Sequence, residues 1–183
     1  MKINCVIAID PGRAGGLAVF IKGEPNVRTA RMPKDVGELQ AFFQHYNENY
    51  NTIVFLEKLS VRPDDVAVEG GNANLGKLYR IQQMMADYEH LKAMLEIVGL
   101  PYVMVHPSSW QAKLKLRLPG QKMEKAERKR LYKQMASHWY PEVKTTLWNA
   151  DALCLLQFAR LVLVNDLKWV LSNIPQREHD KLF

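Results

Sequence analysis

Three carboxylates in this chain stand at places where the surrounding sequence is apolar. Asp10 ends the run NCVIAID, Glu57 ends TIVFLE, and Asp151 interrupts the run TTLWNADALCLLQFARLVL at residues 145–163. Burying an unpaired carboxylate is costly, so such a group usually has a cation, a helix cap or a metal as its partner. If the three lie together, divalent cations would make the cluster tolerable, and Mg²⁺ prefers carboxylate oxygens.

Each carboxylate also has an ordinary structural interpretation. Asp10 begins the turn signal DPG, and Glu57 suits an exposed strand end. Asp151 suits the first turn of a helix with Asn149 as its N-cap, where the macrodipole favours negative charge. These interpretations stay open for each residue taken singly, whereas the metal hypothesis requires all three to meet.

Hydrophobic patterning predicts the elements that would bring them together. Apolar runs and turn signals predict strands at 4–9, 15–23, 26–32, 51–57 and 101–105. Helices are predicted at 36–50 and 78–98, from HPSSW with a serine as the candidate cap, from about 123 and from 149 to about 167. The first three strands form an antiparallel meander. The fourth follows a helical crossover and is therefore expected parallel to the first and beside it. Asp10 and Glu57 would then lie together at the carboxyl ends of neighbouring strands.

The length and composition are those of one ordinary globular domain covering residues 1–183. The order of the predicted elements indicates the α/β class, with a mixed five-stranded sheet flanked by helices. Cys5 and Cys154 lie in apolar runs and are expected to be reduced core residues. No run approaches the length of a membrane span, and the N-terminus does not resemble a signal peptide. We therefore expect no membrane partner. The expected location is the cytoplasm, or the cytoplasm of the host cell if the protein comes from a virus.

Positive charge is concentrated in residues 113–133. This segment carries nine basic residues against two acidic ones, and so exceeds the net charge of +6 of the whole chain. A solvated helix face is the plain interpretation. The contrast with the slightly acidic remainder favours a phosphate-binding surface. The basic residues are Lys113, Lys115, Arg117, Lys122, Lys125, Arg128, Lys129, Arg130 and Lys133.

The motifs IAIDPG, GGLAVF, VFLEKL, HPSSW and ADAL, in this order, resemble the RuvC family of Holliday junction resolvases over roughly residues 3–165. The resemblance implies the ribonuclease H-like fold and a homodimer that nicks two strands of a four-way DNA junction symmetrically. It implies Mg²⁺, with Mn²⁺ as substitute, held by Asp10, Glu57 and Asp151. In the two-metal scheme one ion activates water and the other stabilises the leaving 3′-oxygen.

The resemblance also implies lysines near the scissile phosphate, which would offset charge in the transition state. One matches Lys122 or Lys125. For the other, Gln111 follows Trp110 and Lys113 is the nearest substitute. The loop at 58–76 corresponds to the family's junction-probing loop. The expected DNA-binding residues are Arg62, Lys113, Lys115, Arg117, Lys122, Lys125, Arg128 and Lys129.

Two further expectations concern helices. The helix at 78–98 would lie near the family's dimer interface, so Met84, Met85 and Tyr88 face either a partner subunit or the chain's own core. The second is a departure from the family, which has another acidic residue three or four positions before the ADAL aspartate. Here those positions hold Trp148 and Leu147, which cannot bind metal.

The missing carboxylate predicts weaker binding of a second metal. Asn149 could supply a neutral oxygen, but two positions before Asp151 it points about 160° away on a regular helix. The site would then work with weaker metal binding, or the chain would bind junctions with reduced cutting. Other hypotheses are a non-catalytic nucleic-acid-binding module, a nuclease for RNA or other branched DNA and, least favoured, a phosphotransferase.

Overall fold

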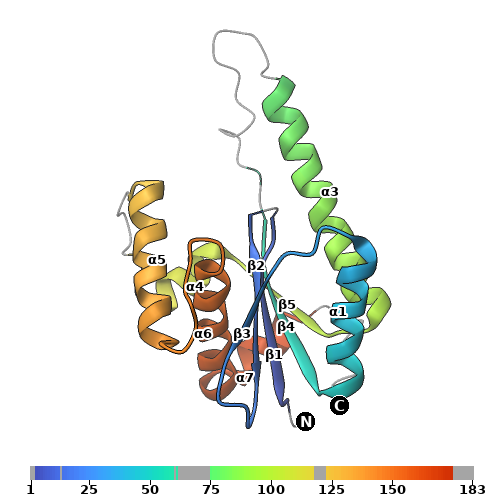
Figure 1. Ribbon diagram of the computed structural model, residues 1–183, viewed down its shortest axis with the longest axis vertical. Helices are drawn as coiled ribbons and strands as arrows, with labels where there is room; N and C mark the ends of the chain where they lie inside the picture. The colour runs from blue at the N-terminus through green and yellow to red at the C-terminus, as the bar shows by residue number, and fades with distance from the viewer. Residues whose placement is uncertain (1–2, 13, 60, 62–74, 118–122, 175–183) are drawn as a thin grey trace.

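The computed structural model describes residues 3–12, 14–59, 61, 75–117 and 123–174. A five-stranded sheet lies between two groups of helices (Figure 1). The strands are β1 (Cys5–Asp10), β2 (Gly16–Ile21), β3 (Arg28–Arg31), β4 (Thr52–Glu57) and β5 (Tyr102–Val105). Their order is β3-β2-β1-β4-β5, with β1–β2 and β2–β3 antiparallel and β1–β4 and β4–β5 parallel. The predicted meander and parallel pairing are confirmed.

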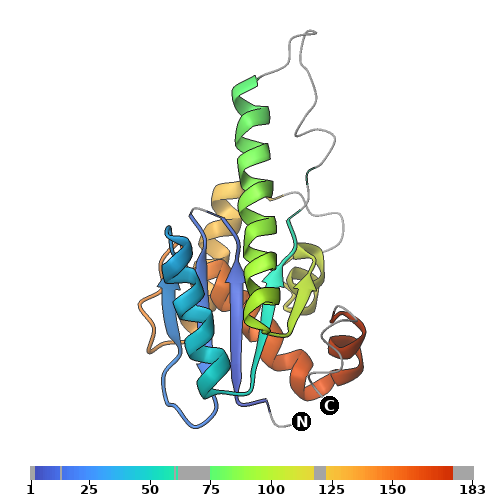
Figure 2. The same ribbon diagram turned by 90° about the vertical axis from the view of Figure 1, so that its right-hand side faces the viewer.

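The helices cover both faces of this sheet. They are α1 (Val36–Asn49), α3 (Leu75–Val98), α4 (Pro107–Lys113), α5 (Lys125–Trp139), α6 (Ala150–Asn165) and α7 (Leu167–Ser172). Helices α1 and α3 pack on one face, while α6 packs on the other with α5 and α4 behind it (Figures 1 and 2). Among the described residues, none of these helices is long and apolar enough to cross a membrane.

The central strand β1 is apolar throughout because both of its faces are covered. Cys5, Ile7 and Ile9 belong to the core on the α1 and α3 side, and Val6 and Ala8 belong to the core on the α6 side. This alternation follows from the period of two along a strand. Cys5 and Cys154 are both buried and free, as expected.

Helix α3 extends beyond the end of the sheet (Figures 1 and 2). Tyr88 is buried, and Met85 packs against the core beneath α1 and α3. These two side chains therefore belong to the chain's own core, while Met84 is half-buried.

Two local expectations were wrong. The predicted helix from 149 to 167 ends at Asn165, because Asp166 leaves the helical path and its side chain accepts a hydrogen bond from Trp169 N at 3.3 Å, which starts α7. The N-cap of α4 is His106, whose Nδ1 accepts from Ser108 N at 3.3 Å, and not a serine. An imidazole nitrogen can accept as a serine oxygen does, a substitution that cap preferences do not anticipate.

Candidate active site

The three carboxylates of the sequence analysis meet at one end of the sheet. Asp10 is the last residue of β1 and Glu57 the last of β4. The parallel register pairs Ile9 with Leu56, so the two acids follow at adjacent positions. Asp151 lies in the first turn of α6, which packs on β1. The parallel pairing of β1 and β4 thus brings Asp10 and Glu57, 47 residues apart in the sequence, to the same end of the sheet. The packing of α6 on β1 brings Asp151 to this end as well.

Burial and mutual repulsion dominate the electrostatics of this site. Desolvation, followed by the charge of Asp151, raises the pKa of Asp10 to about 7. Desolvation, followed by the charges of Asp10 and Asp151, raises the pKa of Glu57 to about 8. In both cases the positive charge of Lys129 acts in the opposite direction. Like charges that affect one another this strongly are typical of functional sites.

Each of two carboxylates has one oxygen engaged by a neighbour. Trp110 Nε1 donates a hydrogen bond to Glu57 Oε2 at 3.0 Å. Lys129 Nζ donates to Asp151 Oδ2 at 2.6 Å. The other oxygen of Asp151, Oδ1, is buried and has no hydrogen-bond partner among the residues that the structure describes. Buried polar atoms are nearly always paired, so an unpaired one points to a missing ion or water.

The backbone next to Asp10 is held by a close approach within the β1–β2 turn. A Cβ on Gly15 would lie 2.1 Å from the carbonyl oxygen of Asp10, which leaves no room for a side chain. Gly15 N donates to Gly12 O at 2.9 Å, which closes the turn. Glycine at position 15 therefore positions the first carboxylate.

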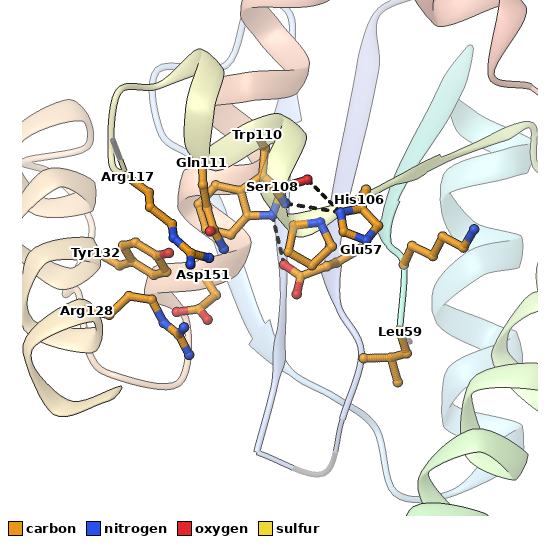
Figure 3. A pocket seen from close by; sticks show the side chains of 12 residues that line it. Glu57, Leu59, His106, Ser108, Trp110, Gln111, Arg117, Arg128, Tyr132 and Asp151 are labelled. Carbon is orange, nitrogen blue, oxygen red and sulfur yellow. Dashed lines mark hydrogen bonds between the residues drawn. The ribbon is translucent and has the colours of Figure 1, made fainter. Parts of the chain in front are cut away.

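A cavity of about 230 Å³ is lined by two of these acids, Glu57 and Asp151, and by residues of the basic segment, whereas Asp10 is not part of its lining (Figure 3). Arg117 and Arg128 enter it from one side with Asp151 near them, and Glu57 and Trp110 lie on the other side. The full lining is Glu57, Lys58, Leu59, His106, Pro107, Ser108, Trp110, Gln111, Arg117, Arg128, Tyr132 and Asp151. A cavity lined by both carboxylates and guanidinium groups suits an anion together with a cation.

The donor chemistry fits a hard divalent cation only in part. Carboxylate oxygens are the right ligands, and Asp151 Oδ1 is free to accept one. However, within the described part of the chain, no three His, Cys, Asp or Glu side chains are placed to hold one ion together. Binding by all three acids would require the carboxylates to draw together, and Lys129 or Trp110 to give up an oxygen.

The basic residues predicted to bind DNA divide into four groups. Arg117 and Arg128 line the cavity. Lys129 is engaged by Asp151, whereas Lys113, Lys115 and Lys125 are exposed and do not line the cavity. Arg62 and Lys122 lie outside the described residues, as does most of the loop at 58–76.

Trp148 occupies the place of the missing acid in a specific way. Thr146 O accepts from Ala150 N, so the chain before α6 already follows a helical path and residue 148 lies one turn before Asp151. Two indole carbons would lie 2.8 and 2.9 Å from a Cβ on Gly16, the residue that pairs with Asp10. Trp148 therefore packs beside Asp10, where a fourth carboxylate would be expected.

Asn149 does not replace that carboxylate. Its side chain is fully buried, and its Oδ1 accepts from Thr146 N at 2.7 Å and from Thr146 Oγ1 at 3.1 Å. It stands at the N-cap position of α6 but makes no side-chain cap bond. The amide holds the turn before the helix, so Asn149 is the N-cap residue, as predicted, but does not cap the helix through its side chain.

Four of the residues that line the cavity were not predicted from the sequence as site residues: His106, Ser108, Gln111 and Tyr132. The position of the motif HPSSW could have indicated two of them. Val105, the last residue of β5, pairs with Glu57, so the residues that follow it lie close to this carboxylate. His106 Nδ1 lies 2.7 Å from Ser108 Oγ. Tyr132 is one helical turn from Arg128 on α5 and so faces the same side.

We predict that the metal-free protein loses stability as the pH rises. The unfolded chain releases these protons near pH 3.8 and 4.5, but folded Asp10 and Glu57 hold them to about 7 and 8. The folded state binds these protons more tightly, so the stability that the two groups contribute is full below about pH 4 and is lost as the pH rises through about 7 and 8. In EDTA, Tm should drop by roughly 5–10 °C between about pH 5.5 and about pH 8.5, since 1 kcal/mol corresponds to roughly 2–4 °C.

The control for this measurement is Asp10→Asn, which removes one of the titrating groups and should flatten the curve. Mn²⁺ should raise Tm more at the higher pH, where the carboxylates are ionised. A Tm in EDTA that stays constant over this range would contradict the raised pKa values.

No protein-family model matches the chain, and no curated protein sequence matches it significantly. Among solved structures, RuvC of Thermus thermophilus matches with a TM-score of 0.54 and 14% identity, over 93% of this chain and 98% of the other. T. thermophilus RuvC in complex with a Holliday junction substrate matches with a TM-score of 0.49 and 14% identity, over 88% and 96%. At this identity the likeness concerns the fold alone: the chain has the ribonuclease H-like mixed sheet with flanking helices found in RuvC.

Proposed function

We propose that this protein is a metal-dependent, structure-selective endonuclease that cleaves four-way DNA junctions by paired symmetric nicks. The observation that carries the proposal is one cavity lined by Glu57 and Asp151 on the one hand and by Arg117 and Arg128 on the other. Asp10, coupled to both acids, completes the carboxylate set. The motifs that resemble the RuvC family and the RuvC-like fold support the choice of substrate.

The chain's own residues have separable tasks in this reaction. Arg117 and Arg128 would hold the scissile phosphate, because guanidinium groups bind phosphate oxygens in pairs. Asp10, Glu57 and Asp151 would hold Mg²⁺ or Mn²⁺, which supplies Lewis-acid activation of water and stabilises the leaving oxygen. Water adds across the P–O3′ bond, which leaves a 5′-phosphate and a 3′-hydroxyl.

The wider basic surface would bind the rest of the junction. Lys125, Arg130 and Lys133 are exposed on α5, and Lys113 and Lys115 are exposed at the end of α4. Exposed lysines and arginines of this kind bind the phosphate backbone without reading sequence. Two symmetric nicks require two active sites, so a homodimer belongs to the proposal.

The direct test compares nicking rates on a synthetic four-way junction, a fork, a linear duplex and an RNA–DNA hybrid, with Mg²⁺ and with Mn²⁺. We expect the junction to be cut at least about tenfold faster than the other substrates, at symmetric positions in opposite strands. Faster cleavage of the hybrid or of the fork would assign the site to a different nuclease. Cleavage that persists in EDTA would remove the metal from the proposal.

A second candidate is a junction-binding module with weak or no cutting. Trp148 in the place of a fourth acid favours it, as does the lack of a ready three-residue metal group among the described residues. This protein would bind junctions tightly in gel-shift assays but leave them intact at any Mg²⁺ or Mn²⁺ concentration.

A further inference from the structure

Lys129 differs from the other basic residues of its helix. Its Nζ lies 2.6 Å from Asp151 Oδ2, and its side chain is 30% exposed while that of Asp151 is 13% exposed. By comparison, Lys125 and Lys133, one turn away in either direction, are exposed. Lys129 is therefore part of the carboxylate site, while its neighbours are free to bind phosphate.

The ammonium group of Lys129 acts on the whole carboxylate set. It makes the one ion pair to a site carboxylate within the described residues, and its charge also acts on Asp10 and Glu57. Lys129 and Asp151 come from neighbouring helices, α5 and α6, which pack against one another. The contact is therefore held by the fold and does not depend on a bound ligand.

The ligands for two divalent cations are not present on α6. Position 148 holds an indole packed on Gly16, and the amide oxygen of Asn149 is used by Thr146. Asp151 is thus the only carboxylate that α6 provides. Three carboxylates are balanced by one divalent cation and one ammonium group, whereas two divalent cations would overcompensate them.

We propose that Lys129 is a built-in counter-ion that takes the place of a second divalent cation, so that the site binds one Mg²⁺ or Mn²⁺. This inference rests on the proposed function and refines it. Lys129 acts through Asp151, by fixing the carboxylate and supplying positive charge, and is a positioning residue. The neighbouring lysines at 125 and 133 keep the role of phosphate contacts.

The test is a titration of the full-length protein with Mn²⁺ by isothermal calorimetry, without DNA. Wild type should bind one Mn²⁺ per chain. Lys129→Met removes a positive charge in contact with a metal ligand, so it should bind Mn²⁺ at least about tenfold more tightly. Lys129→Arg retains the charge and should return the affinity to within about threefold of wild type. Lys168→Met, at an exposed lysine of α7 outside the proposed DNA-binding surface, is the control and should leave the affinity unchanged.

The outcomes separate this inference from the proposed function. Two Mn²⁺ per wild-type chain with similar affinities, or an unchanged affinity in Lys129→Met, would overturn the counter-ion role and leave nuclease activity possible. The number of Mn²⁺ ions bound per wild-type chain tests the counter-ion role even if Lys129→Met does not fold. No Mn²⁺ binding to any variant would overturn both proposals. The expected affinities without junction cleavage would uphold the inference and defeat the proposed function.

Discussion

Asp10→Asn should abolish nicking of four-way junctions while leaving junction binding nearly intact. The asparagine has the same shape but removes the charge from the carboxylate at the end of β1, which is coupled to both other acids. Metal ions contribute several kcal/mol of transition-state stabilisation, and each 1.36 kcal/mol is about tenfold in rate. The nicking rate should therefore fall at least about 100-fold, measured on a labelled junction under single-turnover conditions.

Binding and stability distinguish this result from simple misfolding. Gel-shift affinity in EDTA should stay within about threefold of wild type, because Asp10 does not line the cavity that holds Arg117 and Arg128. The variant should also be more stable than wild type in EDTA at about pH 8.5, since it no longer buries an ionised carboxylate.

The matched control is Asp35→Asn at the N-cap of α1. The side chain of Asp35 accepts from Gly37 N and Glu38 N, and asparagine caps helices about as well as aspartate. Nicking by this variant should equal that of wild type. If Asp10→Asn cut as fast as Asp35→Asn, Asp10 would have no part in the reaction.

Trp148→Asp should lower the metal concentration required for cleavage. Residue 148 lies one helical turn before Asp151 and beside Gly16, the partner of Asp10 in β2. A carboxylate there would face the same space as Asp10 and Asp151 and add a ligand of the kind that Mg²⁺ prefers. We expect half-maximal nicking at a Mg²⁺ concentration at least about tenfold lower than in wild type.

The appropriate control is Trp148→Asn, which creates the same hole without the charge. Both variants lose the packing of the indole on Gly16 and should melt several degrees lower than wild type, because deleting a large side chain costs roughly 3–5 kcal/mol when it is buried and less when it is half-exposed. The difference between them isolates the carboxylate. Equal metal requirements in the two variants would mean that another residue already fills the place of the fourth ligand.

The local sequence determined the strands and helices and the strand ends at which Asp10 and Glu57 lie. The apolar run before Asp10, the turn signal after it and the apolar run before Glu57 each predict a strand from a few neighbouring residues. Helical crossovers are short and right-handed and usually join neighbouring strands, which places β4 beside β1 and brings the two acids together. These inferences needed no knowledge of side-chain contacts, because strand patterning and crossover rules are properties of the backbone.

What each acid touches was decided by the tertiary structure alone. Glu57 is engaged by Trp110, 53 residues later, and Asp151 by Lys129, 22 residues earlier. Lys129 was predicted to contact DNA, since a run of basic residues does not reveal which of them turns inward. Trp148 was predicted only as the absence of a ligand, because the sequence does not show that Gly16 leaves space for its indole. Such contacts depend on how helices and strands that are far apart in the sequence pack together, and this packing cannot be predicted from a few neighbouring residues.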